Sequence, residues 1–173
     1  DMCGSHGMVD KHYIMYDDVV RVPMMMRWPA GIQPGMEVDS FVSNAVDLAA
    51  TFCDAAGTDI PERFQGESVL PLLSGEGRGR EDIFSTYHGN QFGSFSQRMV
   101  RDRRWKYIWN ATETDELYDL QDDPGELNNR IADPVCSGEI SRLRKRLVSW
   151  MDQTDDSLLN SWTRKQLENE LIV

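Results

Sequence analysis

The sequence predicts an α/β protein in two parts, the end of a helix-covered sheet domain followed by a small α+β subdomain. Three observations predict this fold class. Residues 19–28 (VVRVPMMMRW) are nearly all apolar, as expected for a central strand of a parallel sheet that helices cover on both faces. Residues 43–56 carry apolar side chains at helical spacing. The second half of the chain contains short β-like runs separated by turn residues, followed by an amphipathic helix.

The first part, residues 1–75, is predicted to hold a strand and then a helix. In the apolar run, Pro23 lies near the start, where a strand tolerates a missing N–H group. In the helix, apolar residues recur every three or four positions: Val46, Ala49, Phe52, Cys53 and Ala56. Gly57 follows at the position where a left-handed residue commonly ends a helix. A strand followed by a helix favours an α/β layer.

The second part, residues 76–173, is predicted to be an antiparallel sheet of about four strands packed by a C-terminal helix. A linker rich in glycine and charge, residues 74–80, marks the boundary. The four β-like runs are residues 83–88, 98–101, 105–109 and 116–120. A helix that begins near Ser137 has its apolar residues on one face: Ile140, Leu143, Leu147, Trp150 and Met151. That face can cover one side of the sheet, with Trp105, Tyr107, Trp109 and Trp150 as core aromatics between them.

Composition excludes several classes of function. The 173-residue chain has a formal net charge of −11, which argues against a nucleic-acid partner because phosphate neutralisation requires a basic face. No apolar stretch approaches the roughly 20 residues that span a bilayer. The three cysteines, Cys3, Cys53 and Cys136, stand at wide spacings without a zinc-type cluster, so we interpret them as ordinary small residues.

A set of motifs runs through the chain in a fixed order. The motifs are DMCGSHGMVDK (1–11), YDD (16–18), RVP (21–23), VSNAVDLAATFCDAAG (42–57), GESVLPLL (66–73), RWKYI (104–108) and ELYDLQDDP (116–124). In this order they resemble the C-terminal portion of the sulfatases, a family of the alkaline-phosphatase-like superfamily. The resemblance covers nearly the whole chain. It implies that residues 1–75 end an alkaline-phosphatase-like sheet domain and that residues 76–173 form the small C-terminal subdomain.

The resemblance also implies an activity, a cofactor and a nucleophile. Sulfatases hydrolyse sulfate esters, here expected on a sulfated carbohydrate, with Ca²⁺ and a formylglycine nucleophile. Formylglycine arises from Cys or Ser in a CxPxR-type motif, which none of the three cysteines matches, and the family's metal ligands precede the GxHG element. We therefore expect the nucleophile and metal ligands in the rest of the sulfatase chain, and no activity from this chain alone. The parent protein is expected to be periplasmic, secreted or lysosomal.

The resemblance identifies one active-site residue. Lys11 stands at the family position whose ammonium contacts the sulfate ester oxygens, a sensible role for a compact cation beside a transferring group. Without the motif, a solvated surface lysine would be the favoured interpretation. His6, in the same loop, is expected either to hydrogen-bond an ester oxygen or to bond only its own backbone. Asp10, Asp17 and Asp18 are interpreted as structural, with no metal role.

The second part offers a candidate substrate contact. His88 ends a β-like run and opens a polar and aromatic loop, residues 87–92, suited to binding sugar rings and hydroxyls. A hydrogen-bonded surface histidine is the competing interpretation. The basic residues of 98–106 form a further cluster, which either attracts a polyanionic glycan or is the wet face of a hairpin. That cluster comprises Arg98, Arg101, Arg103, Arg104 and Lys106.

Two alternatives to a sulfatase remain at this stage. One is a phosphodiesterase or phosphonate hydrolase of the same superfamily, which shares the scaffold and the metal chemistry. The other is a non-catalytic fragment that binds a glycan or a protein partner, because this chain contains no nucleophile motif. A nucleophile motif upstream of Asp1 would distinguish them.

Overall fold

The computed structural model describes residues 1–11, 13–89 and 94–168 and divides the chain into two compact units. One unit joins Asp1–Val22 to the chain from Phe84 onward, and the other is Pro23–Ile83. The division between residues 75 and 76 stays a prediction about the domains of the complete protein. Among the described residues, no helix is long and apolar enough to cross a membrane.

The Pro23–Ile83 unit is organised around one buried carboxylate. Asp47, only 2% exposed, begins helix α2 (Asp47–Ala55), which is the predicted 43–56 helix with narrower bounds. Its side chain accepts hydrogen bonds from the amides of Ser43 (2.7 Å) and Glu67 (3.0 Å) and from Arg80 Nη2 (2.6 Å). A second short helix, α3 (Leu70–Ser74), follows it in this unit. One charged side chain thus ties three loop segments to the start of α2.

The predicted central strand at residues 19–28 is wrong. Residues Asp17–Val20 form a single helical turn, α1, and residues 21–28 contain no strand. A strand exists through ladder hydrogen bonds with a neighbour, and no described strand of this chain pairs with this segment. Met25 is 95% exposed as a result. The apolar run indicated a preference for burial but not a partner.

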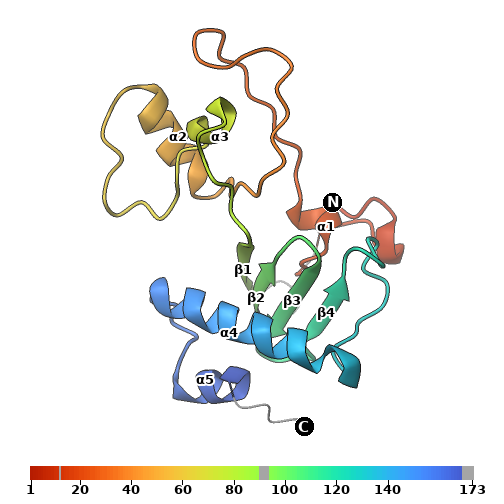
Figure 1. The fold of residues 1–173 in the computed structure, drawn as a ribbon. Coiled ribbons are helices and arrows are strands. Elements are labelled where there is room, and N and C mark those ends of the chain that lie inside the picture. Colours follow the sequence, from red (N-terminus) through yellow and green to blue (C-terminus); the bar gives the residue numbers. More distant parts are fainter. Residues whose placement is uncertain (12, 90–93, 169–173) are drawn as a thin grey trace. The chain divides into compact units, whose positions relative to one another are not determined.

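The predicted antiparallel sheet is confirmed. Its strands are β1 (Ile83–Gly89), β2 (Phe95–Arg101), β3 (Trp105–Asn110) and β4 (Glu116–Asp119), in the order β1-β2-β3-β4 (Figure 1). The pairs β2–β3 and β3–β4 are antiparallel, with Val100 opposite Tyr107 and Tyr107 opposite Leu117. Asp102 closes the β2–β3 turn by accepting hydrogen bonds from the amides of Arg104 and Trp105.

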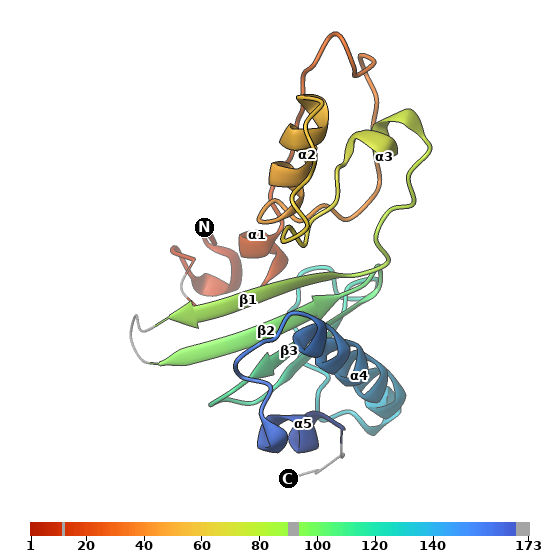
Figure 2. The ribbon, with the colours of Figure 1, turned by 90° about the vertical axis from the view of Figure 1, so that its left-hand side faces the viewer.

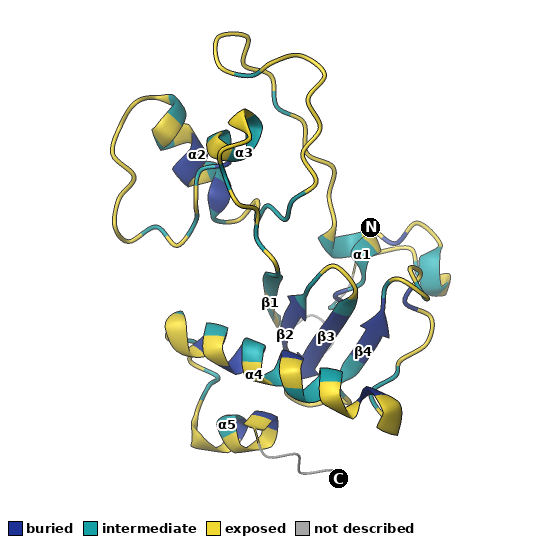
Figure 3. Cartoon of the chain, viewed as in Figure 1, coloured by how far each residue is buried: buried dark blue, intermediate teal, exposed yellow. Residues whose placement is uncertain are grey.

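Helix α4 (Ser137–Gln153) covers one face of this sheet, as predicted, and α5 (Ser161–Glu168) packs beside it (Figures 1 and 2). Side chains that alternate along the strands, such as Val100, Tyr107 and Leu117, point into this layer. The buried core residues here are Val100, Tyr107, Trp109, Leu117, Cys136, Leu143, Leu147, Val148, Met151 and Leu167. Figure 3 shows strands β2, β3 and β4 as the most continuously buried part of this unit.

The opposite face of the sheet is covered by the N-terminal segment. Met15 packs there against Met99 and Ile108. Their sequence neighbours Val100 and Tyr107 belong to the core on the α4 side. Tyr16 and Val20 pack against the cluster of Met15, Met99 and Ile108. The unit that joins Asp1–Val22 to the chain from Phe84 onward, called the C-terminal unit below, therefore has three layers: α4, the sheet and the N-terminal segment.

Candidate functional site

The loop at residues 2–9 is a tight turn held by its own backbone. Gly4 and Gly7 adopt left-handed φ angles of 103° and 72°, which glycine reaches without strain. The amide of Gly4 donates to Met8 O (2.8 Å), and the amide of Ser5 donates to Met2 O (2.8 Å). His6 also has a positive φ, 51°, which is uncommon for a residue with a side chain. The GSHG motif thus specifies a tight backbone turn with His6 in its middle.

His6 is held by ring stacking. Its ring lies 4.0 Å from the ring of Tyr16, nearly parallel to it, and Tyr16 in turn meets Tyr118 of β4 edge to face. Ser5 Oγ donates to Asp18 Oδ2 (2.6 Å), which fixes the same turn from the other side. Within the described residues, His6 Nε2 is buried and has no hydrogen-bond partner. A buried polar nitrogen without a partner is unfavourable by about 1–3 kcal/mol, so a hydrogen-bond partner for Nε2 would be stabilising.

Lys11 presents its ammonium to solvent. Its side chain is 68% exposed, and Nζ lies 3.4 Å from Asp1 Oδ1 and 4.0 Å from Asp10 Oδ1. Its amide donates to Asp10 Oδ1 (2.7 Å), so Asp10 shapes the backbone at this point. Exposed ion pairs of this length are weak. The ammonium is therefore available to a bound anion.

His88 lies on β1 and faces an arginine. Its Nε2 is 2.6 Å from Arg98 Nη2, and its Nδ1 is 3.4 Å from Ser96 Oγ. A guanidinium can only donate, so His88 must accept at Nε2 and be neutral in this arrangement, with its proton on Nδ1. Arg98 also donates to both oxygens of Asp156, at 2.5 and 2.9 Å. Burial alone would raise the pKa of Asp156, but the hydrogen bonds from Arg98 lower it overall.

Tyr13, which follows Lys11 closely in sequence, contacts β2, the strand next to the one that carries His88. Tyr13 stacks on Phe95, with ring centroids 3.7 Å apart and an interplanar angle of 4°. Phe95 precedes Ser96, the residue that contacts His88. Of the loop predicted to bind a sugar, Asn90, Gln91 and Phe92 lie outside the described residues.

Only part of the predicted basic cluster faces solvent, because Arg103 and Arg104 are exposed but the other three members are not. The side chains of Arg98 and Lys106 are 1% and 0% exposed, and each forms ion pairs with carboxylates. Arg101 Nη2 lies 3.0 Å from Asp17 Oδ2. The two interpretations of the cluster both assumed that its charges face water. The structure uses Arg98, Arg101 and Lys106 as internal counter-ions instead.

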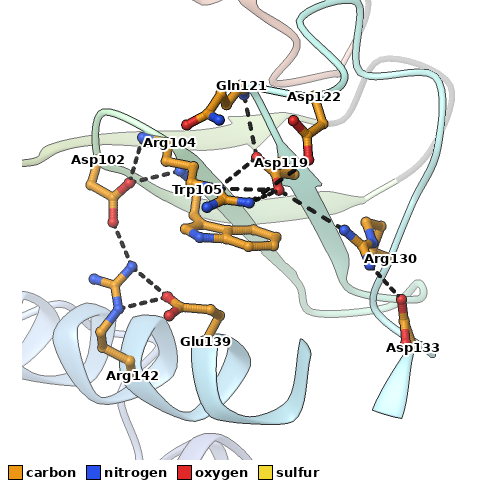
Figure 4. Close-up of polar contacts among 10 residues, drawn as sticks. All are labelled: Asp102, Arg104, Trp105, Asp119, Gln121, Asp122, Arg130, Asp133, Glu139 and Arg142. Atoms are coloured by element: carbon orange, nitrogen blue, oxygen red, sulfur yellow. Dashed lines mark hydrogen bonds and ion pairs between the residues drawn. The ribbon is translucent and has the colours of Figure 1, made fainter. Parts of the chain in front are cut away.

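Arg104 belongs to a belt of ion pairs around Trp105 (Figure 4). It binds the buried carboxylate of Asp119 through Nε (3.0 Å) and Nη2 (2.7 Å), and this contact holds the pKa of Asp119 below its usual value. Arg130 lies over Trp105 with its guanidinium carbon 6.0 Å from the ring centroid, and it binds Asp133 at 2.7 Å. The belt joins β3, β4 and the following loop. The RWKYI and ELYDL motifs thus have a structural role here.

Lys106 was missed as an organising residue. Its Nζ donates to Met15 O (3.0 Å) and Asp17 Oδ1 (2.6 Å) and lies 2.6 Å from Glu126 Oε1. Burial raises the pKa of Glu126, and the Lys106 ammonium offsets part of that rise. The available signal was the strand period, because Lys106 shares a face with the buried Ile108. A charged residue on the buried face of a strand requires counter-ions.

Among the described residues, no group of three or more His, Cys, Asp and Glu side chains could hold a metal ion. Asp17 and Asp18 are instead bonded to Lys106 and Ser5. The chemistry that these residues can supply is therefore a solvent-accessible ammonium at Lys11 and imidazole nitrogens at His6 and His88.

Comparison with known proteins gives a consistent set of similarities. Residues 4–153 match the family described as N-sulphoglucosamine sulphohydrolase, C-terminal. The chain is 33% identical over 161 residues to the Delta 4,5-hexuronate-2-O-sulfatase of Bacteroides thetaiotaomicron, covering 90% of this chain and 34% of that protein. A protein solved in complex with its substrate D-glucosamine-2-N,6-O-disulfate is similar with a TM-score of 0.80 and 29% identity, covering 89% of this chain and 32% of that one.

A more distant similarity is to the phosphonate monoester hydrolase of Agrobacterium radiobacter. It has a TM-score of 0.56 and 27% identity, covering 62% of this chain and 24% of that one. This chain spans about a third of the length of the two relatives described before it.

Proposed function

This chain belongs to the sulfatase family, as part of its C-terminal region, and from that premise we propose that the complete protein hydrolyses sulfate esters of a carbohydrate. The observation that carries the proposal is the family match over residues 4–153, which includes most of the loop that presents His6 and Lys11. The relatives include a hexuronate-2-O-sulfatase and a protein with a sulfated glucosamine as its substrate. A sulfated amino sugar or uronic acid is therefore the proposed substrate class.

In this proposal, Lys11 stabilises charge during cleavage of the S–O bond. As the sulfuryl group leaves the sugar, negative charge grows on the leaving oxygen and the sulfate oxygens. An ammonium close to these oxygens stabilises that charge. The exposed Nζ of Lys11, held only by weak pairs with Asp1 and Asp10, suits this role.

His6 is proposed as a second contact to the same group. Its Nε2 is buried and lacks a partner among the described residues, while stacking on Tyr16 fixes the ring plane. An ester oxygen at hydrogen-bond distance from Nε2 would remove this deficit. His6 and Lys11 would then bind one anion from a single loop.

His88 is proposed to contact the sugar rather than the sulfate. It is neutral in its present hydrogen bonding, and Ser96 Oγ lies 3.4 Å from its Nδ1. A neutral imidazole beside a hydroxyl group is suited to the hydroxyls of a sugar. A role at the rim of the site follows from this chemistry.

The nucleophile and the metal are proposed to come from the rest of the protein. By family resemblance these are formylglycine and Ca²⁺, and the described residues do not fit a calcium site because they contain no cluster of ligands. None of the three cysteines stands in a CxPxR-type motif. The proposal therefore expects the 173-residue chain alone to release no sulfate from any ester.

The test is a substrate panel for the complete protein. The panel holds an aryl sulfate, sulfated glucosamines, sulfated uronic acid disaccharides, an aryl phosphonate monoester and a phosphodiester. Free sulfate and phosphate or phosphonate products are quantified by ion chromatography. The expected result is sulfate release from a sugar at a higher kcat/KM than turnover of either phosphorus ester. Preference for the phosphonate would support the hydrolase alternative, and sugar binding without turnover would support a non-catalytic role.

A further inference from the structure

A fully buried ammonium lies between the sheet and the segment that follows the His6 loop. Lys106 is the central charge, with two hydrogen bonds and one ion pair to three separate oxygens. These oxygens belong to Met15, Asp17 and Glu126, which lie far from Lys106 in sequence or on other elements. Each of the three N–H groups of the ammonium thus has an oxygen nearby.

The carboxylates extend this network to other residues. One carboxylate oxygen of Asp17 accepts a hydrogen bond from Lys106 (2.6 Å), and the other lies 3.0 Å from Arg101 Nη2. Arg101, on β2, is the cross-strand neighbour of Lys106. Glu126 Oε2 accepts a hydrogen bond from the Asp17 amide (2.6 Å), while its Oε1 faces Lys106. Glu126 does this from a left-handed backbone with a φ of 54°. The backbone of the loop after β4 thus places the Glu126 carboxylate within hydrogen-bond distance of the Asp17 amide.

The network reaches the candidate site in one step. The ring of Tyr16, the residue before Asp17, stacks on the ring of His6. Asp18, on the other side, accepts the hydrogen bond from Ser5. The loop that holds His6 and leads to Lys11 is thus anchored on residues 15–18, and these residues are anchored on Lys106.

Stability alone does not account for this arrangement. A buried ion network is often no more stabilising than apolar residues of the same size, because the desolvation of its charges opposes their attraction. Apolar packing between Met15, Met99 and Ile108 already attaches the segment to the sheet. Directional bonds add a fixed register and orientation, which apolar contacts supply poorly.

We propose that the Lys106–Asp17–Glu126 network is a positioning device that holds the loop bearing His6 and Lys11 in its working orientation. Lys106, Asp17 and Glu126 are then positioning residues for the reaction, without contact to the substrate. The proposal rests on the proposed function for its effect on rate, but its structural effect is measurable separately.

The experiment compares two matched substitutions in the complete protein. Asp17→Asn weakens the network, since its amide would place an N–H group against Lys106 or Arg101. Asp115→Asn is the control, because the Asp17 and Asp115 side chains are similarly exposed, at 18% and 15%. Asp115 pairs with Arg144 at 2.9 Å and accepts a hydrogen bond from Tyr107, on the face of the sheet that α4 covers. Thermal melts establish that each variant is folded at the assay temperature.

Two readouts separate positioning from general destabilisation. Asp17→Asn should lower kcat by about tenfold to a hundredfold, as expected for a displaced catalytic group, with KM changed less than about threefold. Asp115→Asn should leave kcat within about threefold of wild type at the same temperature. Hydrogen exchange followed by mass spectrometry should show faster exchange for residues 1–20 in Asp17→Asn only.

The outcomes are distinct. Unchanged exchange of residues 1–20 in Asp17→Asn, or equal loss of kcat in both variants, would overturn the proposal. If the wild type releases no sulfate from any ester, the proposed function fails, and the exchange data still decide whether the network holds the loop. If Asp17→Asn does not fold, Glu126→Gln, which keeps an acceptor for the Asp17 amide, replaces it with the same readouts and criteria.

Discussion

Replacing Lys11 with alanine is the sharpest test of the proposed active-site loop. The substitution is expected to slow hydrolysis of every sulfate ester by the complete protein while leaving the fold intact. Loss of one preorganised charge-stabilising group typically raises the barrier by about 3 kcal/mol, or roughly a hundredfold or more in rate. Because the contact is to the sulfate group, the loss should be similar for an aryl sulfate and a sulfated sugar.

The effect on stability follows from the geometry. The Lys11 side chain is 68% exposed, and its ion pairs with Asp1 and Asp10 have N–O distances of 3.4 and 4.0 Å. Exposed pairs contribute about 0–1 kcal/mol. The free energy of unfolding should therefore change by less than about 1 kcal/mol, far below the change in activation free energy.

The assay is steady-state kinetics with thermal melts on four proteins. They are wild type, Lys11→Ala, Lys11→Arg and, as a matched surface control, Lys145→Ala on α4, where the lysine is also exposed. Lys11→Arg should recover only part of the activity, because a planar guanidinium cannot occupy the position of a compact ammonium. A Lys11→Ala protein with normal melting and near-normal kcat/KM would refute the assignment and leave Lys11 as a surface residue.

Three further predictions concern the C-terminal unit. His88→Ala should lower kcat/KM for the natural sugar sulfate more than for an aryl sulfate, and kinetics on both substrates check this; equal losses would move His88 to the sulfate group. Asp119 has a pKa held below 3.8 by Arg104, so its stabilising effect is present above that pH and is lost as the pH falls through the lower folded value. Asp119→Asn should therefore lower the melting temperature at neutral pH and flatten its decline below about pH 4, as melts in a pH series would detect; an unchanged acid decline would contradict this. Leu147→Ala, at a position with 0% exposure in the α4 core, should reduce the free energy of unfolding by about 2–5 kcal/mol in denaturant titration; a change below about 1 kcal/mol would mean that the α4 contact is poorly packed.

The second half of the fold could be predicted because its signals are local. Alternating side chains, turn residues and the apolar face of α4 specify each element within a few residues of sequence, and the antiparallel pairs connect neighbours in the chain. Trp105, Tyr107, Trp109 and Trp150 were expected in the core, and all four belong to it or pack against it.

The failures share a physical cause, which is separation along the chain. The apolar run at residues 19–28 predicted a strand, but a strand requires a partner that a local pattern does not identify. The ion pair between Lys106 and Asp17 spans 89 residues of sequence, and neither residue shows its partner in its own segment. Lys11 and His6 were singled out only through the order of a long motif, because a lone lysine or histidine carries little information.

The sheet lies between α4 and residues 1–22, and this arrangement limits how proteins of the family can exchange segments. A chimera joined at the linker, with a C-terminal unit taken from a relative, would combine one protein's Asp17 with another protein's Lys106 and Glu126. Any mismatch would leave a charge without its counter-ion in a fully buried position. In evolution, these distant positions are therefore expected to change together, and a functional graft would have to transfer both segments of the unit.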